Sequence, residues 1–217
     1  MKYFISAFCA ALLPFTGMLT ADYQAKDFSH LIGNVPGIDD ELLKMHFKLY
    51  EGYVKNSNLL LKKIGELDEK KDNRSPEYAG MKRMLGWELD GMFLHEYYFD
   101  NLGKTDAPSS DSPLAQKIVK DFGSFDAWKD DFIATGSIRG IGWVVAYTDP
   151  KDGRLVNQWI NEHDVGHLAG GKPLLIMDVF EHAYITQYGL DRAKYINAFF
   201  ENINWKKVEE RYNALQK

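Results

Sequence analysis

The sequence contains very little cysteine: one residue, Cys9, among 217. That cysteine lies within the first 21 residues, so the remainder of the chain carries no thiol. A disulfide framework and a cysteine-ligated metal site are therefore excluded for residues 22–217. The lack of thiols also leaves this part of the chain compatible with an oxidising compartment.

The sequence also lacks a block of basic residues. Its 26 Lys and Arg are outnumbered by 31 Asp and Glu, which gives a formal net charge of −5. Because nucleic-acid-binding surfaces need a clustered basic excess, we expect no nucleic-acid partner. The composition is not that of a disordered or fibrous protein either, since 45% of residues are apolar and 14% are aromatic. A packed, aromatic-rich interior is expected.

Residues 1–21, MKYFISAFCAALLPFTGMLTA, begin with one early lysine, continue with an apolar stretch and end in small residues. This is the layout of a secretory signal peptide, and the stretch is short for a membrane span. We therefore predict a signal peptide over 1–21 and a mature chain that is periplasmic or secreted, with no membrane association after cleavage. The alternative is an uncleaved N-terminal anchor helix.

Helical periodicity dominates the first part of the remaining chain. Apolar residues recur at spacings of three and four from Ile38 to about Leu67, and Ser75-Pro76 is typical of a helix start. We predict two antiparallel helices joined by a charged tract. The segment 103–113, rich in Ser, Pro and Asp, interrupts this pattern. The predicted organisation is a helical hairpin domain over 22–108 and a second domain over 109–217.

The second domain mixes helical and strand patterns. A β-hairpin is expected around the Pro-Lys-Asp-Gly turn at 150–153, and a third strand over 173–178. Helices are expected at 114–121, 125–136, 190–201 and 205–215. The predicted fold class is α+β: an N-terminal antiparallel helical hairpin followed by a mixed α/β domain with a small three-stranded antiparallel sheet.

Four polar residues occur where apolar ones are expected. His46 and His95 lie on the apolar faces of the two long predicted helices, Asp178 ends the most apolar strand, and His182 follows four residues later. A single buried histidine is more often a core residue than a ligand, but two facing helices can bring their imidazoles together. A helix N-cap is an alternative for Asp178, although it leaves the histidines unexplained. Three imidazoles and one carboxylate suit Fe, Mn, Co or Zn better than Ca or Mg.

Motifs at four separate places resemble those of the iron/manganese superoxide dismutases. The stretch DVFEHAY is similar to the family signature DxWEHAY, with Phe180 in place of the usual tryptophan. Three further stretches resemble family motifs: FLHEYYFDNL at 93–102, FGSFDAWKDDF at 122–132, and GIGWVVAY at 140–147, which contains Trp143. The resemblance covers nearly all of residues 22–217.

The resemblance implies a site and an activity. The ligands of one Fe or Mn ion per subunit are His46, His95, Asp178 and His182, together with a solvent molecule. The substrate is superoxide, which is disproportionated to dioxygen and hydrogen peroxide. The ligand set is the same for both metals, so the sequence does not choose between them. A non-enzymatic relative that keeps the fold for metal binding or interaction is the alternative.

The resemblance also places residues that move protons. Some family members carry a side chain that donates to the metal-bound solvent at the position of Gly91, and others at the position of His163. The expected donor here is therefore His163, with His167 as the competing candidate. Tyr53 is expected at the substrate entrance, although it follows His46 by seven residues rather than the family's eight. Tyr50 is an alternative for that place, for a missing family histidine, or for simple core packing.

Residues at the subunit interface are implied as well. Glu181 is expected to reach a ligand histidine of a second copy, which makes the protein a homodimer, with a tetramer as the alternative. Ile185 replaces a tyrosine that the family uses there, so the usual proton path is altered. Arg192 matches an arginine at the family's substrate entrance, or is a surface residue. Trp143, Phe180 and Tyr50 are expected to line the site.

Overall fold

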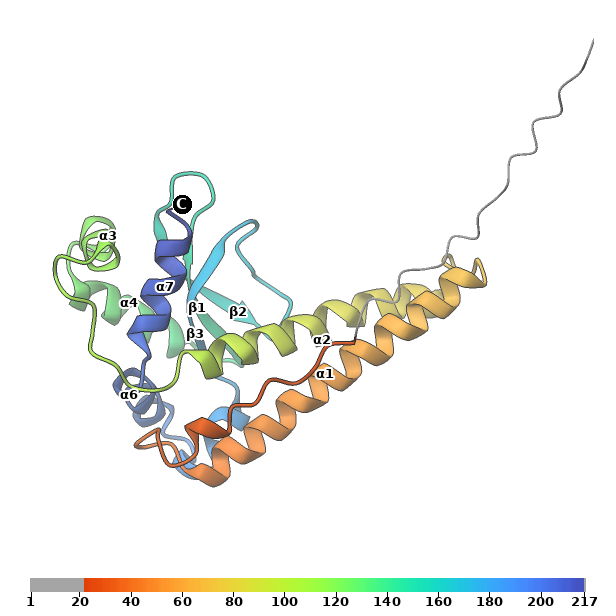
Figure 1. Cartoon of the computed structure of the whole chain (residues 1–217), viewed down its shortest axis with the longest axis horizontal. Helices are drawn as coiled ribbons and strands as arrows, with labels where there is room; N and C mark the ends of the chain where they lie inside the picture. The colour runs from red at the N-terminus through yellow and green to blue at the C-terminus, as the bar shows by residue number, and fades with distance from the viewer. Residues whose placement is uncertain (1–21, 217) are drawn as a thin grey trace, which may run out of the picture.

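The computed structural model describes residues 22–216, so the predicted signal peptide and Cys9 lie outside the described residues. Two long antiparallel helices, α1 (Asp40–Glu69) and α2 (Pro76–Asp100), extend from a mixed α/β region (Figure 1). Helix α2 begins as predicted, because the hydroxyl of Ser75 accepts a hydrogen bond from the amide of Tyr78. No helix in residues 22–216 is both long enough and apolar enough to cross a membrane.

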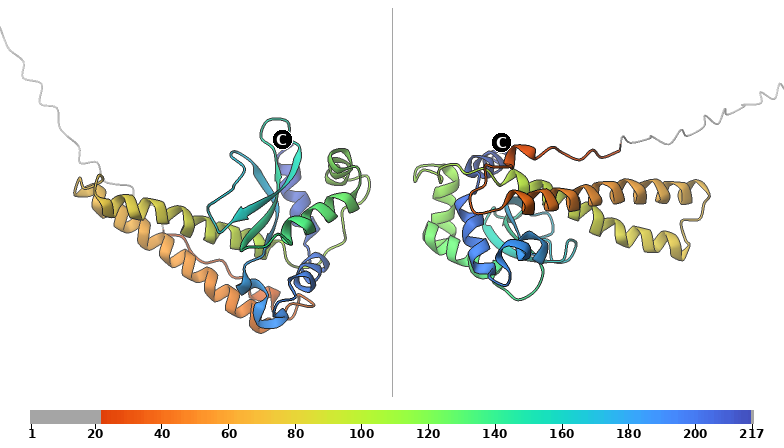
Figure 2. Two further views of the ribbon diagram at one scale, coloured as in Figure 1. Left: turned by 180° about the vertical axis from the view of Figure 1, so that it is seen from behind. Right: turned by 90° about the horizontal axis from the view of Figure 1, so that it is seen from below.

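The predicted α+β class is confirmed. The sheet has three strands in the order β2-β1-β3, and both pairings are antiparallel. Helices α2 and α7 contact β3, while α4 contacts β1 and β2 (Figure 2). The elements of this region are α3 (Pro113–Phe122), α4 (Phe125–Gly136), β1 (Gly142–Thr148), β2 (Leu155–Asn161), β3 (Lys172–Asp178), α6 (Arg192–Glu201) and α7 (Trp205–Ala214).

Three short elements were not predicted from the sequence. They are the 3-10 helices η1 (Ser29–Leu31) and η2 (Glu181–Ala183), and the one-turn helix α5 (Ile185–Tyr188). Residues 103–112 form no helix or strand, and they separate α2 from α3. The division into domains at this segment stays a prediction.

The central strand β1 is buried along its whole length because both of its edges are paired and helices cover its faces. Its first residue must be glycine: Gly142 has φ +133°, and a Cβ there would lie 1.9 Å from the carbonyl oxygen of Ile160. The next residue, Trp143, pairs directly with Asp178 on β3. The register of the sheet therefore sets a tryptophan beside the predicted carboxylate ligand.

Residues 22–28 form an extended segment that follows the hairpin helices (Figure 1). The backbone of Tyr23 forms two hydrogen bonds of 2.9 Å with the amide side chain of Asn58 on α1. The ammonium of Lys26 lies 2.6 Å from the carboxylate of Glu96 on α2, and its backbone amide donates to the hydroxyl of Tyr50. This segment thereby ties the two helices together from outside.

Glu88 is a buried carboxyl group between α1 and α2. One oxygen accepts a hydrogen bond from Asn56 at 3.3 Å, and the other has no hydrogen-bond partner among the described residues. Burial raises the pKa of Glu88 above its ordinary value, because the charged form loses its hydration. The folded chain therefore favours the protonated carboxyl group at this position.

The stability of the metal-free protein should depend on pH in a way that Glu88→Gln removes. A raised folded-state pKa contributes stability that is fully present below the unfolded-state pKa of about 4.3 and is lost as the pH rises through the folded-state value. We expect the free energy of unfolding of the wild type to fall, relative to that of the variant, as the pH rises from about 4 to about 7. Urea unfolding of both proteins across this range measures the difference, and parallel curves contradict the prediction.

Candidate metal centre

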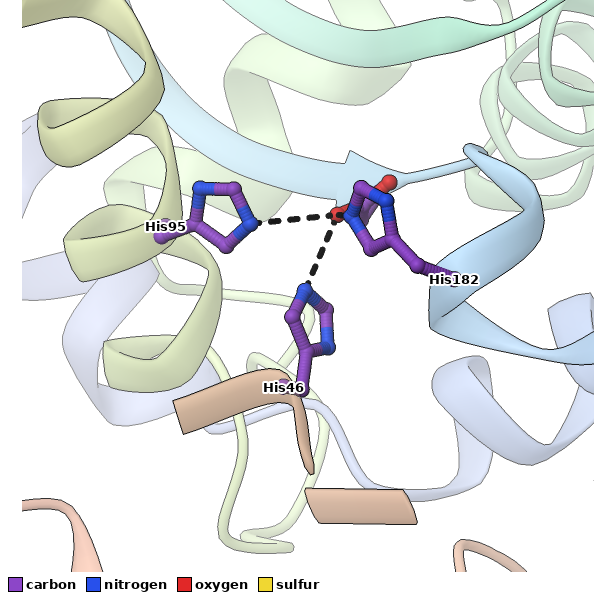
Figure 3. A group of neighbouring side chains, drawn as sticks. His46, His95 and His182 are labelled. Atoms are coloured by element: carbon purple, nitrogen blue, oxygen red, sulfur yellow. Dashed lines mark hydrogen bonds and ion pairs between the residues drawn. The ribbon is translucent and has the colours of Figure 1, made fainter. Parts of the chain in front are cut away.

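The four predicted ligands come together at one point. Helix α1 supplies His46, α2 supplies His95, the end of β3 supplies Asp178 and η2 supplies His182, and their ligand atoms all lie within 4.8 Å of one another. Figure 3 shows the three imidazoles turned toward one carboxylate oxygen. Oδ2 of Asp178 lies 3.1 Å from Nε2 of His46, 3.0 Å from that of His182 and 3.7 Å from that of His95.

The chain around Asp178 holds its carboxylate in this orientation. Oδ1 accepts a hydrogen bond from the amide of Phe180 at 2.8 Å, which leaves Oδ2 directed at the histidines. The backbone carbonyl of Asp178 accepts a hydrogen bond from the hydroxyl of Tyr195 at 2.8 Å. The N-cap alternative for Asp178 is wrong, because Phe180 occupies the N-cap position of η2.

Burial and charge set the protonation of the cluster. Burial lowers the pKa of His46 and brings that of His95 well below its ordinary value, so both imidazoles are neutral. Burial also acts to raise the pKa of Asp178, but the charge of nearby His182 and the hydrogen bonds from His182 and His46 outweigh it and hold the net pKa below its ordinary range. Neutral imidazole and ionised carboxylate are the forms that bind metals.

One buried atom in particular fits a metal ion. The carbonyl of Gly91 lies 2.5 Å from Nδ1 of His95, so Nδ1 carries the hydrogen and Nε2 has a free lone pair. This Nε2 is buried, points at the cluster and has no hydrogen-bond partner among the described residues. An unsatisfied buried acceptor is costly, and a cation at this point satisfies it. The set of three nitrogens and one oxygen suits iron or manganese.

A second group of hydrogen bonds lies beside the cluster. His163 is fully buried, and burial lowers its pKa to about 4, so its imidazole is neutral near pH 7. The indole of Trp143 donates to Nδ1 of His163 at 3.0 Å. Because the indole can only donate, the single imidazole hydrogen sits on Nε2, which is 2.7 Å from the hydroxyl oxygen of Tyr53. The tautomer of His163 is therefore fixed by its neighbours.

This arrangement gives Tyr53 a defined orientation. Its oxygen accepts from His163, so the hydroxyl hydrogen is left to donate elsewhere. Burial raises the pKa of Tyr53, which keeps the phenol protonated near pH 7. The ring stacks on His95 with a centroid distance of 5.1 Å. The shorter spacing after His46 thus still returns Tyr53 to the face of α1 that carries the ligand.

The ring of Tyr53 also leaves no space for a side chain at Gly91. A Cβ at position 91 would lie 2.6 Å from Cδ1 of the Tyr53 ring and 2.8 Å from Cε1, closer than real Cβ contacts. The ring of Tyr53 therefore fills the space in which a side chain at position 91 would begin. This explains why α2 carries glycine one turn before His95, and why the polar partner of Tyr53 comes from the His163 loop.

Several other predicted residues have contacts of their own. Tyr50 is buried, and its hydroxyl donates to Glu96 and accepts from the amide of Lys26, so it anchors the N-terminal segment, while its ring centroid lies 6.5 Å from that of His95. Phe180 stacks on His182 with a centroid distance of 5.0 Å. Trp143 meets the ring of His95 edge-on at 4.9 Å.

Arg192 is held by backbone carbonyls. Its guanidinium donates to the carbonyls of Ile138 and Gly140 at 2.8 and 2.7 Å, and it lies over the ring of Tyr184. These contacts tie the start of α6 to the segment before β1. The role of Arg192 at the substrate entrance stays a prediction.

Sequence reasoning missed several residues beside the site, and Trp87 is one of them. The ring of Trp87 on α2 meets that of His163 edge-on, with a centroid distance of 4.5 Å. Trp87 precedes His95 by eight residues, which places it about 80° around the helix from that ligand, so spacing gives only a weak signal for it.

A site of three histidines and one aspartate, set between a helical hairpin and a small sheet, defines the class of a protein with a single-ion metal centre. The sequence profile of the C-terminal domain of iron/manganese superoxide dismutases matches residues 110–211. The superoxide dismutase [Fe] of Cupriavidus metallidurans is 38% identical over 197 residues, covering 88% of this chain and 97% of that protein.

Of two further relatives, one is named for iron and the other for manganese. The superoxide dismutase [Fe] of Aquifex aeolicus is 35% identical, covering 85% of this chain and 88% of that protein. The superoxide dismutase [Mn] 2 of Haloferax volcanii is 33% identical, covering 82% and 88% respectively. The chain belongs to the iron/manganese superoxide dismutase family. It is thus an oxidoreductase, a superoxide dismutase whose cofactor is iron or manganese.

Proposed function

We propose that the chain disproportionates superoxide to dioxygen and hydrogen peroxide at one Fe or Mn ion held by His46, His95, Asp178 and His182. The observation that carries the proposal is that the four ligand atoms lie within 4.8 Å of one another and include a buried imidazole nitrogen that has no hydrogen-bond partner within residues 22–216. The ion, when bound, supplies the one-electron oxidation and reduction that the reaction needs. Asp178 supplies negative charge to this site, and the neutral imidazoles supply lone pairs.

Proton supply is the part of the reaction assigned to Tyr53 and His163. Two superoxide ions consume two protons to give one dioxygen and one hydrogen peroxide, so a held donor beside the metal assists the reaction. Tyr53 is protonated, and its oxygen already accepts the Nε2 hydrogen of His163, which leaves the hydroxyl hydrogen available to a neighbour. His163 thereby keeps the tyrosine in the donating orientation. A direct bond from His163 to metal-bound solvent stays a prediction.

Reconstitution with single metals tests the function. The purified chain is stripped of metal and loaded separately with iron, manganese and zinc, and bound metal and superoxide removal are measured for each. We expect activity with iron or with manganese, and none with zinc, which has no accessible redox change. Loading with iron and manganese but activity with neither defeats the enzymatic proposal and supports the non-enzymatic alternative.

We also propose that the enzyme is a homodimer in which Glu181 of each copy reaches a ligand histidine of the other. In the single chain Glu181 is exposed, and the adjacent ligand His182 has 29% of its side chain exposed. A histidine that binds a metal is usually oriented by a hydrogen bond from its other ring nitrogen. A carboxylate from another copy would accept that bond. Ile185, four residues after Glu181 in the sequence, is also exposed.

Glu181→Ala should lose metal and weaken dimerisation together. The carboxylate is expected to orient a ligand across the interface, and the removal of such partners typically lowers metal affinity by about 10- to 100-fold. Metal analysis and sedimentation equilibrium measure the two effects. Glu66→Ala is the matched control, since Glu66 is exposed on α1 and far along the hairpin. A Glu181 variant that stays dimeric and fully metallated contradicts the proposal.

For localisation we propose export, with residues 1–21 removed. The signal-like pattern of these residues and the absence of thiols from 22–217 support it. The intact mass of the chain recovered from the periplasmic or extracellular fraction tests it. A full-length chain that is recovered with the membrane supports the uncleaved anchor instead.

A further inference from the structure

We propose that His167 is a positioning residue that fixes the loop carrying His163, and through it the hydrogen bond between His163 and Tyr53. The kinetic consequence rests on the proposed role of these two residues in proton supply, whereas the structural consequence stands without it. The loop is residues 162–171, which connect β2 to β3 and lie outside any helix or regular strand.

Two histidines of the loop face two aromatic residues of β1 in register. His163 and His167 are four residues apart, and so are Trp143 and Tyr147. Trp143 donates from its indole to Nδ1 of His163 at 3.0 Å, and the hydroxyl of Tyr147 lies 2.9 Å from Nδ1 of His167. The loop is thereby bound to the central, fully buried strand at two points.

The second nitrogen of His167 holds the backbone of His163. Its Nε2 lies 2.7 Å from the carbonyl oxygen of His163, and since a carbonyl only accepts, Nε2 carries the hydrogen. Nδ1 of a neutral His167 then accepts from Tyr147. The carboxylate of Asp90 on α2 lies 3.6 Å from the same Nε2 and adds electrostatic attraction. His167 therefore connects β1, α2 and the backbone of the residue that bonds to Tyr53.

Little else holds the middle of this loop. Val165 is 54% exposed, so apolar burial does not anchor it. The backbone turns sharply at Gly166, where φ is +104° and a Cβ would lie 3.1 Å from the carbonyl oxygen of Trp159. The hydrogen bond from the amide of Asn161 to the carbonyl of Val165 closes the turn but does not involve the carbonyl or the side chain of His163.

The same contacts argue against a zinc ion bound by His163 and His167. Each of the four ring nitrogens already has a partner: Trp143 and Tyr53 for His163, and Tyr147 and the His163 carbonyl for His167. A metal ligand needs a free lone pair directed at the ion. The two histidines thus act as hydrogen-bonding supports, one for the tyrosine and one for the loop.

The indole hydrogen of Trp143 provides a direct readout. Its exchange with solvent reports whether His163 stays in place, and the indole of Trp128 on α4, which donates to Asn157 at 3.1 Å, is an internal reference. Nuclear magnetic resonance on the folded, zinc-loaded protein follows both signals, because zinc is diamagnetic and suits the same ligands. In His167→Ala we expect Trp143 exchange to accelerate at least about tenfold, with Trp128 unchanged.

Kinetics on the iron- or manganese-loaded protein complete the test. We expect kcat of His167→Ala to fall roughly tenfold with full metal content and little change in KM, in the range known for groups behind a metal site. His167→Gln keeps an amide nitrogen that can donate to the His163 carbonyl and should restore much of both readouts. Tyr147→Phe removes only the hydroxyl and should give a smaller change of the same sign. The matched control is His30→Ala, since His30 is exposed on η1.

The possible outcomes are distinct. If Trp143 exchange and kcat of His167→Ala both match the wild type, the positioning role is overturned. A fall in kcat without faster Trp143 exchange overturns it as well, because His167 then acts by another route. Faster exchange with unchanged kcat supports the positioning of His163 and counts against its proposed part in proton supply. Should His167→Ala not fold, the same three comparisons are made with Tyr147→Phe.

Discussion

Replacing Asp178 with asparagine is expected to lower metal affinity at least about 100-fold and to abolish dismutase activity in a protein that still folds. The carboxylate is fully buried, and its Oδ2 is shared among three imidazoles. Losing a group that only orients a ligand costs about 10- to 100-fold in affinity, and losing the one negatively charged ligand costs more. The fold should survive, because the asparagine oxygen can still accept from the amide of Phe180.

Metal content by mass spectrometry, activity after reconstitution and circular dichroism measure the three parts of this prediction. Asp130→Asn is the matched control, since it makes the same chemical change at an exposed aspartate on α4, outside the cluster. An Asp178 variant that binds a full equivalent of metal and retains activity shows that the metal is held elsewhere. Loss of fold in Asp178→Asn, with the control intact, shows that the aspartate is first a structural residue.

The substitution Gly91→Ala is expected to reduce activity by roughly 10- to 100-fold while leaving the four ligands in place. The added methyl would lie 2.6 Å from the ring of Tyr53, so the ring must shift and its 2.7 Å hydrogen bond with His163 is lost. Alanine favours a helix interior over glycine by up to about 1 kcal/mol, but overpacking a filled space typically costs about 1–3 kcal/mol. The clash therefore outweighs the helix preference.

The measurement is activity per bound metal, with the free energy of unfolding taken from urea curves. Gly65→Ala provides the control, because a Cβ at Gly65 on α1 meets nothing within 4 Å and only the helix preference remains. The control should be as active as the wild type and slightly more stable. Full activity in Gly91→Ala means that Tyr53 can leave its place beside His95 without consequence, which contradicts its assigned role.

The sequence was sufficient for the parts of the fold that local physics determines. The long helices followed from three- and four-residue spacing, and the cap at Ser75 lies where the Ser-Pro pair placed it. The four ligands were found because a buried carboxylate and two buried histidines are costly without a partner. Their convergence to within 4.8 Å agrees with that reasoning.

Other features depend on contacts between distant segments. The sequence left open whether Tyr50 lines the site or packs in the core. In the structure its hydroxyl bonds to Lys26 and Glu96, and no sequence spacing connects those residues to it. The contacts of Trp87 and the hydrogen bonds of His167 could not be predicted from spacing, because their partners lie on the loop and on β1. Pattern reasoning reads one element at a time, and these roles arise only when a loop is placed between a helix and a sheet.

The tryptophan that begins this set of hydrogen bonds gives it a permanent direction. The indole of Trp143 has a hydrogen to give and no lone pair to offer, so it admits only one of the two neutral forms of His163. The direction of donation along the series, from Trp143 through His163 to Tyr53, is therefore set by a side chain that neither gains nor loses a proton in water. The direction of these two hydrogen bonds is thus a property of the covalent sequence rather than of the solution, because the indole keeps its hydrogen whatever the pH.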